Sequence, residues 1–191
     1  METLDGHFLI AMPNMKDSRF ARTVIFLCAH SREGAMGFVV NRSLEAPSIP
    51  DFFRQLSIVS EDELDQLPSS VKASTLYSGG PVEPGRGFVL HSAEFMTDTT
   101  LPVSEGICLT ATLEILRAIS TGTGPAKSLL ALGYSGWASG QLEQEIAANG
   151  WLTAPADQSI LFDCENELKY NRALETLGVD PLLLSGDSGH A

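Results

Sequence analysis

The segment from Leu130 to Glu145 carries the densest set of residues that could do chemistry. Its apolar start, its three glycines and its polar end predict a strand, a glycine-rich turn and a helix. This order can hold an anion, because the free N–H groups at the start of a helix attract negative charge. Glu143 and Glu145 already place negative charge in the first turns of that helix, so a bound phosphate would have to tolerate both carboxylates.

Known catalytic and nucleotide-binding motifs do not fit this segment. Its glycines at 133, 136 and 140 lack the Gly-x-Gly-x-x-Gly spacing, and no Lys follows the last one as a phosphate-binding loop requires. A nucleophile elbow also fails, because Trp137 stands where Gly-x-Ser-x-Gly needs its second glycine. Two interpretations stay open. Trp137 anchors the helix to the core after a tight turn, or Tyr134, Gly136 and Trp137 belong to a ligand or partner surface.

Polar side chains of the expected helix lie at the edge of its buried face. Gln141 and Glu145 share one face because they are four residues apart, and Leu142 and Ile146 occupy the neighbouring face. The apolar pair should point inward. The polar pair could then line a cleft or be solvated.

Two other segments have the residue types of a binding loop. Adjacent Gly79 and Gly80, followed by Pro81, permit positive φ angles or a close approach of two backbones. Asn41 and Arg42 directly follow an expected strand, where binding loops often begin. A plain surface turn is the alternative for each segment.

Histidines and cysteines give no sign of a catalytic or metal centre. His91 ends an expected strand and is a candidate polar residue of a cleft. Cys28 and His30 would face the same side of a strand, but two ligands do not make a zinc site, which needs three or four. No spacing marks a Ser-His-Asp triad, which is recognised by geometry. We expect no catalytic residue set, no metal and no cofactor.

Composition and charge restrict the class of protein. The 191 residues, 43% of them hydrophobic, fit one globular domain, which we expect over 1–184, with a disordered tail at 185–191. A net charge of -12 disfavours nucleic acids and anionic membranes. Three distant cysteines form no disulfide framework, the acidic N-terminus is no secretory signal, and no apolar run is long enough for a membrane helix. We expect a cytoplasmic protein, with an oligomeric state that is open and compatible with a monomer.

The elements that must position these residues mix hairpins with helices. Strands are expected at 7–11, 23–29, 36–40, 73–77, 87–91, 100–103, 107–109, 128–133 and 159–162. Helices are expected at 51–58, at 111–120, at 140–149, from a capping box at Ser60, and from an Asn166 cap to Gly178. This mixture indicates an α+β fold and not regular βαβ units.

Four sequence blocks occur in a characteristic order. They are Gly6–Pro13, Gly34–Arg42, Tyr77–Val82 with Gly87–His91, and Gly133–Trp137 leading to Gln141, Glu143 and Glu145. In this order and spacing they resemble the AlgH family, also called YqgE-like, over about residues 4–180. The resemblance implies a mixed β-sheet curled into a partly open barrel with helices packed around it. It also implies a bacterial cytoplasmic protein of a family that has chloroplast relatives.

The resemblance transfers no activity, because the family has no established biochemical activity and no established catalytic residues. Its name comes from a link to the regulation of alginate production, and some members carry a transcriptional-regulator label. Our first hypothesis is therefore a non-enzymatic cytosolic binding or regulatory protein that acts through an unknown protein or small-molecule partner. The candidate binding surface consists of Asn41, Arg42, Gly79, Gly80, Pro81, His91, Tyr134, Gly136, Trp137, Gln141 and Glu145.

Two alternatives remain open. One is an enzyme of unknown class whose cleft is lined by His91, Arg42 and Glu145, which requires these side chains to converge. The other is a direct transcriptional regulator, which the net charge of -12 and the lack of a basic helix both oppose.

Overall fold

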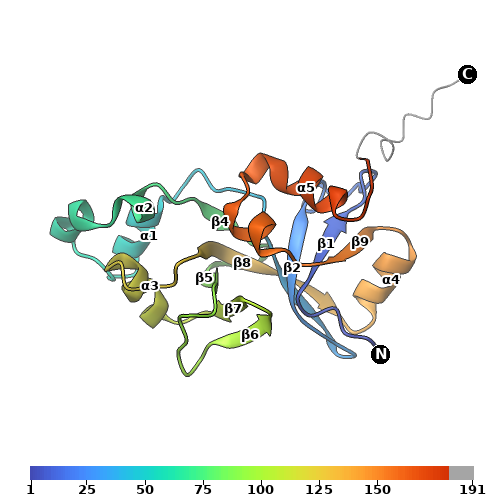
Figure 1. Ribbon diagram of the computed structural model, residues 1–191, viewed down its shortest axis with the longest axis horizontal. Coiled ribbons are helices and arrows are strands. Elements are labelled where there is room, and N and C mark those ends of the chain that lie inside the picture. Colours follow the sequence, from blue (N-terminus) through green and yellow to red (C-terminus); the bar gives the residue numbers. More distant parts are fainter. Residues whose placement is uncertain (181–191) are drawn as a thin grey trace, which may run out of the picture.

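The computed structural model describes residues 1–180, which are built around one curled nine-stranded sheet (Figure 1). The strands are β1 (His7–Ala11), β2 (Val24–Ser31), β3 (Gly34–Val39), β4 (Leu76–Ser78), β5 (Val82–His91), β6 (Leu101–Ser104), β7 (Ile107–Thr110), β8 (Ser128–Ala138) and β9 (Trp151–Pro155). Their order is β6-β7-β5-β8-β3-β2-β1-β9, and β4 pairs in parallel with β8 whereas the other pairs are antiparallel. The expected α+β fold with a mixed, partly open barrel is confirmed.

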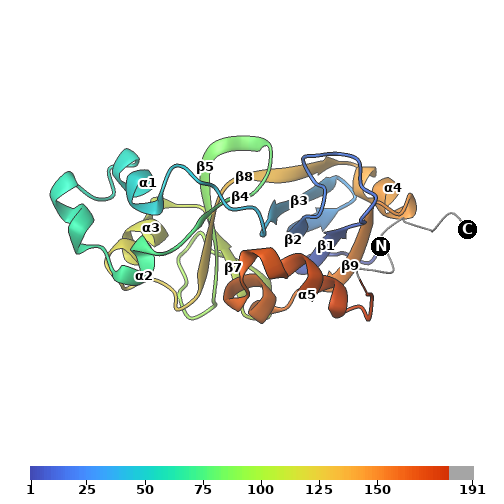
Figure 2. The same cartoon turned by 90° about the horizontal axis from the view of Figure 1, so that it is seen from above.

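Helices gather at both ends of the sheet (Figures 1 and 2). The helices α1 (Ile49–Gln55), α2 (Ser69–Lys72) and α3 (Leu113–Ser120) cluster at one end, and α4 (Gln141–Ala147) and α5 (Lys169–Glu175) pack against the strands at the other. Two 3₁₀ turns, Glu61–Gln66 and Asn166–Leu168, and one π-helical turn, Ser159–Asp163, complete the helical elements of residues 1–180. The longest helix there has 8 residues, and none is long and apolar enough to cross a membrane.

Strand β8 contributes to two hydrophobic cores because its side chains alternate between the two faces of the sheet. Leu130 and Leu132 belong to the core that α1, α2 and α3 cover. Leu129 and Ala131 belong to the core that β1, β2 and α5 share. The first half of β8 pairs with β4 and β5, and its last residues pair with β3. The two ends of the molecule are therefore joined through one strand.

A close contact of two backbones makes this arrangement possible. A Cβ atom at Gly79 would lie 2.3 Å from the Gly133 carbonyl oxygen, and one at Gly80 would lie 2.2 Å from the Tyr134 carbonyl carbon. The Gly79 N–H donates to the Leu132 oxygen at 2.8 Å. Gly133 has a φ of 73°, which an L side chain rarely adopts, at the point where β8 changes partners. We call the approach of Gly79 and Gly80 to Gly133 and Tyr134 the glycine crossing.

Part of the expected local structure is wrong at β8. The segment after Gly133 was expected to be a turn, but it continues as strand to Ala138. Ser135 to Ala138 pair with β3, and this pairing outweighs the turn tendency of the glycines. The glycines are needed because another chain segment lies against them, which a local pattern does not reveal.

Two other expected elements also differ, and one strand was not expected. Residues 159–162 form a π-helical turn and not a strand, because the Asp157 carboxylate accepts from the backbone N–H and the hydroxyl of Ser159, at 2.8 and 2.5 Å. The strand expected at 73–77 starts only at Leu76, after helix α2. Strand β9 was not expected, and it forms because β1 offers a free edge over its whole length.

Two expected helix caps are also absent. The Ser60 hydroxyl donates to the Glu63 carboxylate at 2.9 Å but accepts no backbone N–H, and the segment after it is a 3₁₀ turn. Asn166 begins a 3₁₀ turn, and its buried Oδ1 has no hydrogen-bond partner among the described residues. The expected tail at 185–191 lies outside those residues.

Gly79→Ala is expected to lower the free energy of unfolding by about 2–3 kcal/mol, because the new methyl group cannot avoid the Gly133 oxygen unless a backbone moves. Gly85→Ala is the matched control, since its Cβ would meet no atom within 4 Å. Urea unfolding of both variants measures the difference. Equal midpoints for the two would contradict the importance of the glycine crossing.

Candidate functional site

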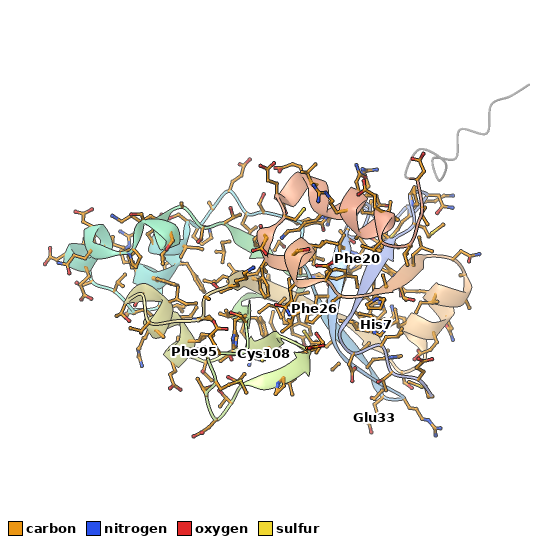
Figure 3. All side chains as sticks on the ribbon, in the orientation of Figure 1. His7, Phe20, Phe26, Glu33, Phe95 and Cys108 are labelled. Carbon is orange, nitrogen blue, oxygen red and sulfur yellow. The ribbon has the colours of Figure 1, made fainter. Side chains whose placement is uncertain are left out.

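A cleft of about 790 Å³ opens between the β2–β3 hairpin and β6, and we call it the seam cleft. Its lining comes from Asp5, from residues 28–31 and 33–36 of the hairpin, from Val82, from residues 101–103 of β6 and from Tyr134, Gly136 and Trp137 of β8. Figure 3 shows Glu33 at the tip of the β2–β3 hairpin, apart from Cys108 of β7. Five distant chain segments therefore build the cleft.

Strand register explains which side chains meet in the seam cleft. Met36 pairs with Ala29 on one side and with Gly136 on the other, so the three lie in one row across the sheet. Tyr134 precedes Gly136 by two residues, which puts it on the same face, where its ring meets the edge of Phe88 at 5.9 Å. Leu101 and Val82 are 48% and 36% exposed, unusually high for large apolar side chains of a sheet.

The lining of the seam cleft has no nucleophile paired with a base. Burial raises the pKa of the Cys28 thiol well above its usual range, which keeps the sulfur protonated. Nδ1 of His30 accepts from the Leu4 N–H at 3.1 Å, and Nε2 lies 2.6 Å from the Glu143 carboxylate, so both ring nitrogens are engaged. The carboxylates in the lining are those of Asp5 and Glu33, and no Lys or Arg is part of it.

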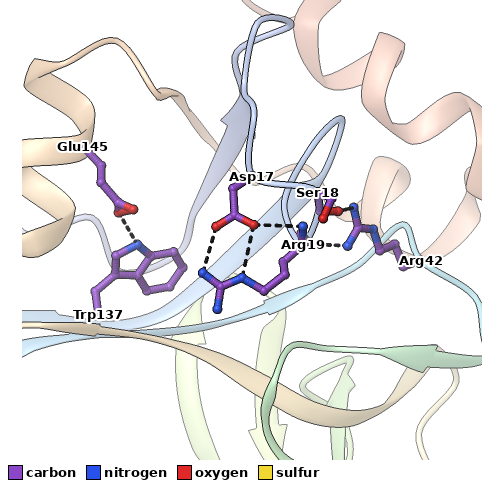
Figure 4. A network of polar contacts seen from close by, with 6 residues as sticks. All are labelled: Asp17, Ser18, Arg19, Arg42, Trp137 and Glu145. Atoms are coloured by element: carbon purple, nitrogen blue, oxygen red, sulfur yellow. Dashed lines mark hydrogen bonds and ion pairs between the residues drawn. The ribbon is translucent and has the colours of Figure 1, made fainter.

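The indole of Trp137 anchors α4 to β8. Its Nε1 donates to Oε2 of Glu145 at 2.8 Å, as Figure 4 shows, and Oε1 of Gln141 accepts from the Ala138 N–H at 2.9 Å. Phe20 stacks on Trp137 with ring centroids 6.4 Å apart, and Trp151 meets both rings edge-on. Gln141 and Glu145 thus hold the start of the helix in place.

The carboxylate of Glu145 is held in an unfavourable environment for its charge. Burial raises its pKa, and nearby Asp17 adds to the rise, while the Trp137 N–H and the charge of Arg19 lower it. The indole N–H of Trp151 also approaches this carboxylate and lowers its pKa, but without the geometry of a hydrogen bond. The environment of residue 145 therefore favours an uncharged hydrogen-bond acceptor, such as a protonated carboxyl group or an amide, over a carboxylate anion.

Asn41 and Arg42 fasten the loop that precedes β2. Oδ1 of Asn41 accepts from the Val24 N–H at 2.9 Å, and Nδ2 donates to the Arg22 oxygen at 3.0 Å. The guanidinium of Arg42 donates to the carbonyl oxygens of Ser18 and Arg19, as Figure 4 shows, and also to that of Ala21. These bonds hold Phe20 over Trp137, so Arg42 and Glu145 belong to one structural network around the loop.

The glycine motif and Arg42 do meet in space. Gly80, Pro81 and Arg42 line a pocket of about 280 Å³ together with Arg19 and three other residues. Gly79 lies next to this pocket in the chain, and its own contacts are those of the glycine crossing. The candidate surface is therefore divided: Tyr134, Gly136 and Trp137 line the seam cleft, and Arg42, Gly80 and Pro81 line the smaller pocket.

His91 lies apart from both groups, fully buried in β5. Its Nδ1 donates to the Ser92 oxygen at 2.9 Å, and its Nε2 accepts from the Thr110 hydroxyl at 2.7 Å. Burial lowers the pKa of the ring, which favours the neutral form. His91 shares no hydrogen-bond partner with Arg42 or Glu145, so the structure does not show the convergence of all three side chains that the enzyme hypothesis requires.

The residues of the seam cleft that sequence analysis missed have no local signal. Val82 stands between Pro81 and Glu83, and Leu101 stands between Thr100 and Pro102, so the neighbours of neither residue in the sequence mark it as part of a cleft. Asp5 and Glu33 are ordinary surface carboxylates in the sequence. Among residues 1–180 no group of three or more His, Cys, Asp and Glu side chains is arranged to hold a metal.

One buried cation also escaped the sequence analysis. Lys169 at the start of α5 is 1% exposed, its Nζ donates to the Val40 oxygen at 2.7 Å, and it lies 4.6 Å from the centroid of the Tyr77 ring. Burial lowers its pKa to about 8. The ammonium group therefore ties α5 to the end of β3 at a cost in desolvation.

Two variants of Glu145 should separate its charge from its hydrogen bond. Glu145→Gln keeps an acceptor for Trp137 without the charge and should be at least as stable as the wild type at pH 7, whereas Glu145→Ala should lose about 1–2 kcal/mol. Burial raises the pKa of Glu145 in the folded protein above its value near 4.5 in the unfolded chain. The contribution of the protonated carboxyl group to stability is therefore full below pH 4.5, and it is lost as the pH rises through the folded pKa. The wild type should therefore lose stability relative to Glu145→Gln between acid and neutral pH. Urea unfolding checks both, and equal losses in the two variants would contradict this role.

Lys169→Met should reveal the lowered pKa of Lys169. The folded group loses its proton near pH 8 and the unfolded group near 10.5, so the stabilising contribution is present above 10.5 and is lost as pH falls through 8. The stability of the wild type relative to Lys169→Met should therefore grow from pH 7.5 to 9.5. Chemical unfolding of both proteins at the two pH values measures it. A constant difference would mean that Lys169 titrates as a solvent-exposed lysine does.

Comparisons with known proteins extend over almost the whole chain. The sequence profile of the AlgH-like family matches residues 8–182. A UPF0301 protein of Sinorhizobium medicae is 55% identical over 188 residues, covering 98% of this chain and 93% of the relative. A UPF0301 protein of Beijerinckia indica is 56% identical over 189 residues, covering 98% and 92%.

Two solved structures share the fold. The solution structure of the AlgH protein from Pseudomonas aeruginosa is 43% identical, with a TM-score of 0.79 over 99% of this chain and 96% of that one. A crystal structure of a protein from Corynebacterium diphtheriae, at 22% identity and a TM-score of 0.71, covers 97% and 93% and shows the fold alone. With its profile match, its close relatives and its curled sheet in agreement, the chain belongs to the AlgH-like family.

Proposed function

We propose that this protein is a non-enzymatic binding protein that acts in regulation by holding a partner in the seam cleft. The observation that carries the proposal is the cleft of about 790 Å³ in which Leu101 and Val82 are left exposed. Clefts of roughly 300–1,000 Å³ are typical of ligand sites. Burying apolar surface in such a cleft contributes about 25 cal/mol per Å² to the free energy of binding, so a partner that fits the cleft would displace water from it.

Binding without catalysis is supported by the chemistry of the lining. Cys28 is kept protonated by burial, and His30 has both ring nitrogens engaged. Outside the lining, the pKa values of the buried or half-buried groups His91, Lys169 and Glu145 are shifted first of all by burial, and each of the three has a hydrogen-bond partner in the fold. A cleft with this lining would act by binding a partner and so changing what that partner does.

A cytosolic location is part of the proposal. Cys28, Cys108 and Cys164 are all free in the structure, which is the usual state of thiols in a reducing compartment. The net charge of -12 is consistent with a soluble protein that avoids anionic surfaces.

An uncharged dye tests the seam cleft without any contribution from charge. Nile red should bind the wild-type protein saturably with a rise in fluorescence, and Leu101→Ser should weaken binding at least about fivefold because it removes apolar contact area. Leu168→Ser is the matched control, since Leu168 is 42% exposed but lies outside the cleft. Equal effects of the two substitutions, or no saturable binding, would remove the cleft as the binding site.

A further inference from the structure

We propose that the seam cleft binds an extended, basic segment of a partner protein, in which apolar side chains alternate with Lys or Arg. This inference rests on the proposed function, because it assumes that the cleft is the binding site. It goes further, because it names the chemistry of the bound segment. The grounds are the exposed carboxylates at the rim of the cleft, the strands β2 and β6 that form its walls, and the apolar side chains that line it.

The charge of the rim selects a cation. Asp5 and Glu33 are both exposed and both in the lining, and no Lys or Arg side chain lines the cleft to neutralise them. His30 adds no free base, since its Nε2 and Nδ1 are engaged with Glu143 and the Leu4 N–H. Arg32 at the hairpin tip is not part of the lining. In a chain of net charge -12, complementary charge would attract a basic segment and repel an acidic one.

The walls of the cleft favour an extended chain over a compact molecule. β6 is the last strand of the sheet order, and it pairs with β7 alone among residues 1–180. On the opposite wall, β2 pairs with β1 only as far as Phe26, so Cys28 to Ser31 have no strand partner on that side. The cleft therefore lies where the barrel fails to close, between two strands. An extended segment can lie along such a space.

Side chains are expected to supply more of the recognition than a backbone ladder does. Pro102 has no N–H to offer and interrupts β6 as a template for strand pairing. The apolar contacts come instead from Leu101, Val82 and Met36, and the flexible thioether of Met36 can adapt to different partners. The partly exposed ring of Tyr134 can accept a cation on its face. Because successive side chains of an extended segment point to opposite sides, alternating residues would turn the apolar side chains toward these apolar groups and the Lys or Arg side chains toward the exposed carboxylates.

Calorimetric titration of the full-length protein with two designed peptides tests the proposal. The basic probe is acetyl-Lys-Val-Lys-Leu-Lys-Val-Lys-amide, and its twin carries Glu in place of every Lys. The basic peptide should bind at least about tenfold more tightly than the twin at low ionic strength, and added salt should reduce the difference. The basic peptide should also displace Nile red from the cleft.

Two double variants separate the rim of the cleft from the overall charge of the protein. Asp5→Asn with Glu33→Gln should weaken binding of the basic peptide about fivefold. Asp62→Asn with Glu114→Gln changes the net charge by the same amount on exposed helical residues outside the lining, and it should weaken binding less than about twofold. Leu101→Ser should weaken binding of the peptide about tenfold.

The outcomes distinguish this inference from the proposed function. Equal effects of the two double variants, or equal binding of the two peptides, would overturn the basic-segment proposal, because binding would then follow overall charge or apolar contact alone. If Nile red binds in the cleft but the basic peptide does not displace it, the cleft remains a binding site for another occupant. If neither binds, both proposals fail.

Discussion

The glycine crossing is the constraint on which the rest of the structure depends. Gly79 and Gly80 lie so close to Gly133 and Tyr134 that a single Cβ atom would collide with a backbone. At this point β8 leaves its partners β4 and β5 and begins to pair with β3. One strand thus belongs to both ends of the sheet, and the sheet curls instead of splitting into two. The glycines give the backbones the room that this change of partners requires.

The curl of the sheet also creates the seam cleft. In a fully closed barrel the two end strands of the order, β6 and β9, would pair with each other. Here, within residues 1–180, β6 and β9 do not pair, and residues Cys28 to Ser31 at the end of β2 have no strand partner on the β1 side. Apolar side chains that a closed barrel would cover are left facing solvent. The exposed surface of the cleft is therefore a direct consequence of an incomplete barrel.

Shifted pKa values often mark functional sites, but the burial that shifts those of Glu145, Lys169 and His91 accompanies contacts that hold the fold together. Glu145 receives the Trp137 N–H and so fixes α4, Lys169 donates to the Val40 oxygen and fixes α5, and His91 joins β5 to the Thr110 hydroxyl of β7. Burial is the largest cause of the shift in each case. The chemistry that remains available lies in the seam cleft, which has apolar side chains and two carboxylates but no reactive pair.

The sequence by itself determined the fold class, the family and most strands, because these depend on local periodicity and on ordered motifs. Local periodicity predicted the strand at 7–11 and the hairpin at 23–40. Four ordered sequence blocks predicted membership of the AlgH-like family. Only the tertiary structure decided that residues 133–138 are strand, that 159–162 are not, and that Tyr134 and Gly136 share a cleft with Leu101 while His91 lies elsewhere. The physical reason is that pairing with β3 and the approach of Gly79 act between distant segments. A cleft built from five separate segments has no signature in any one of them.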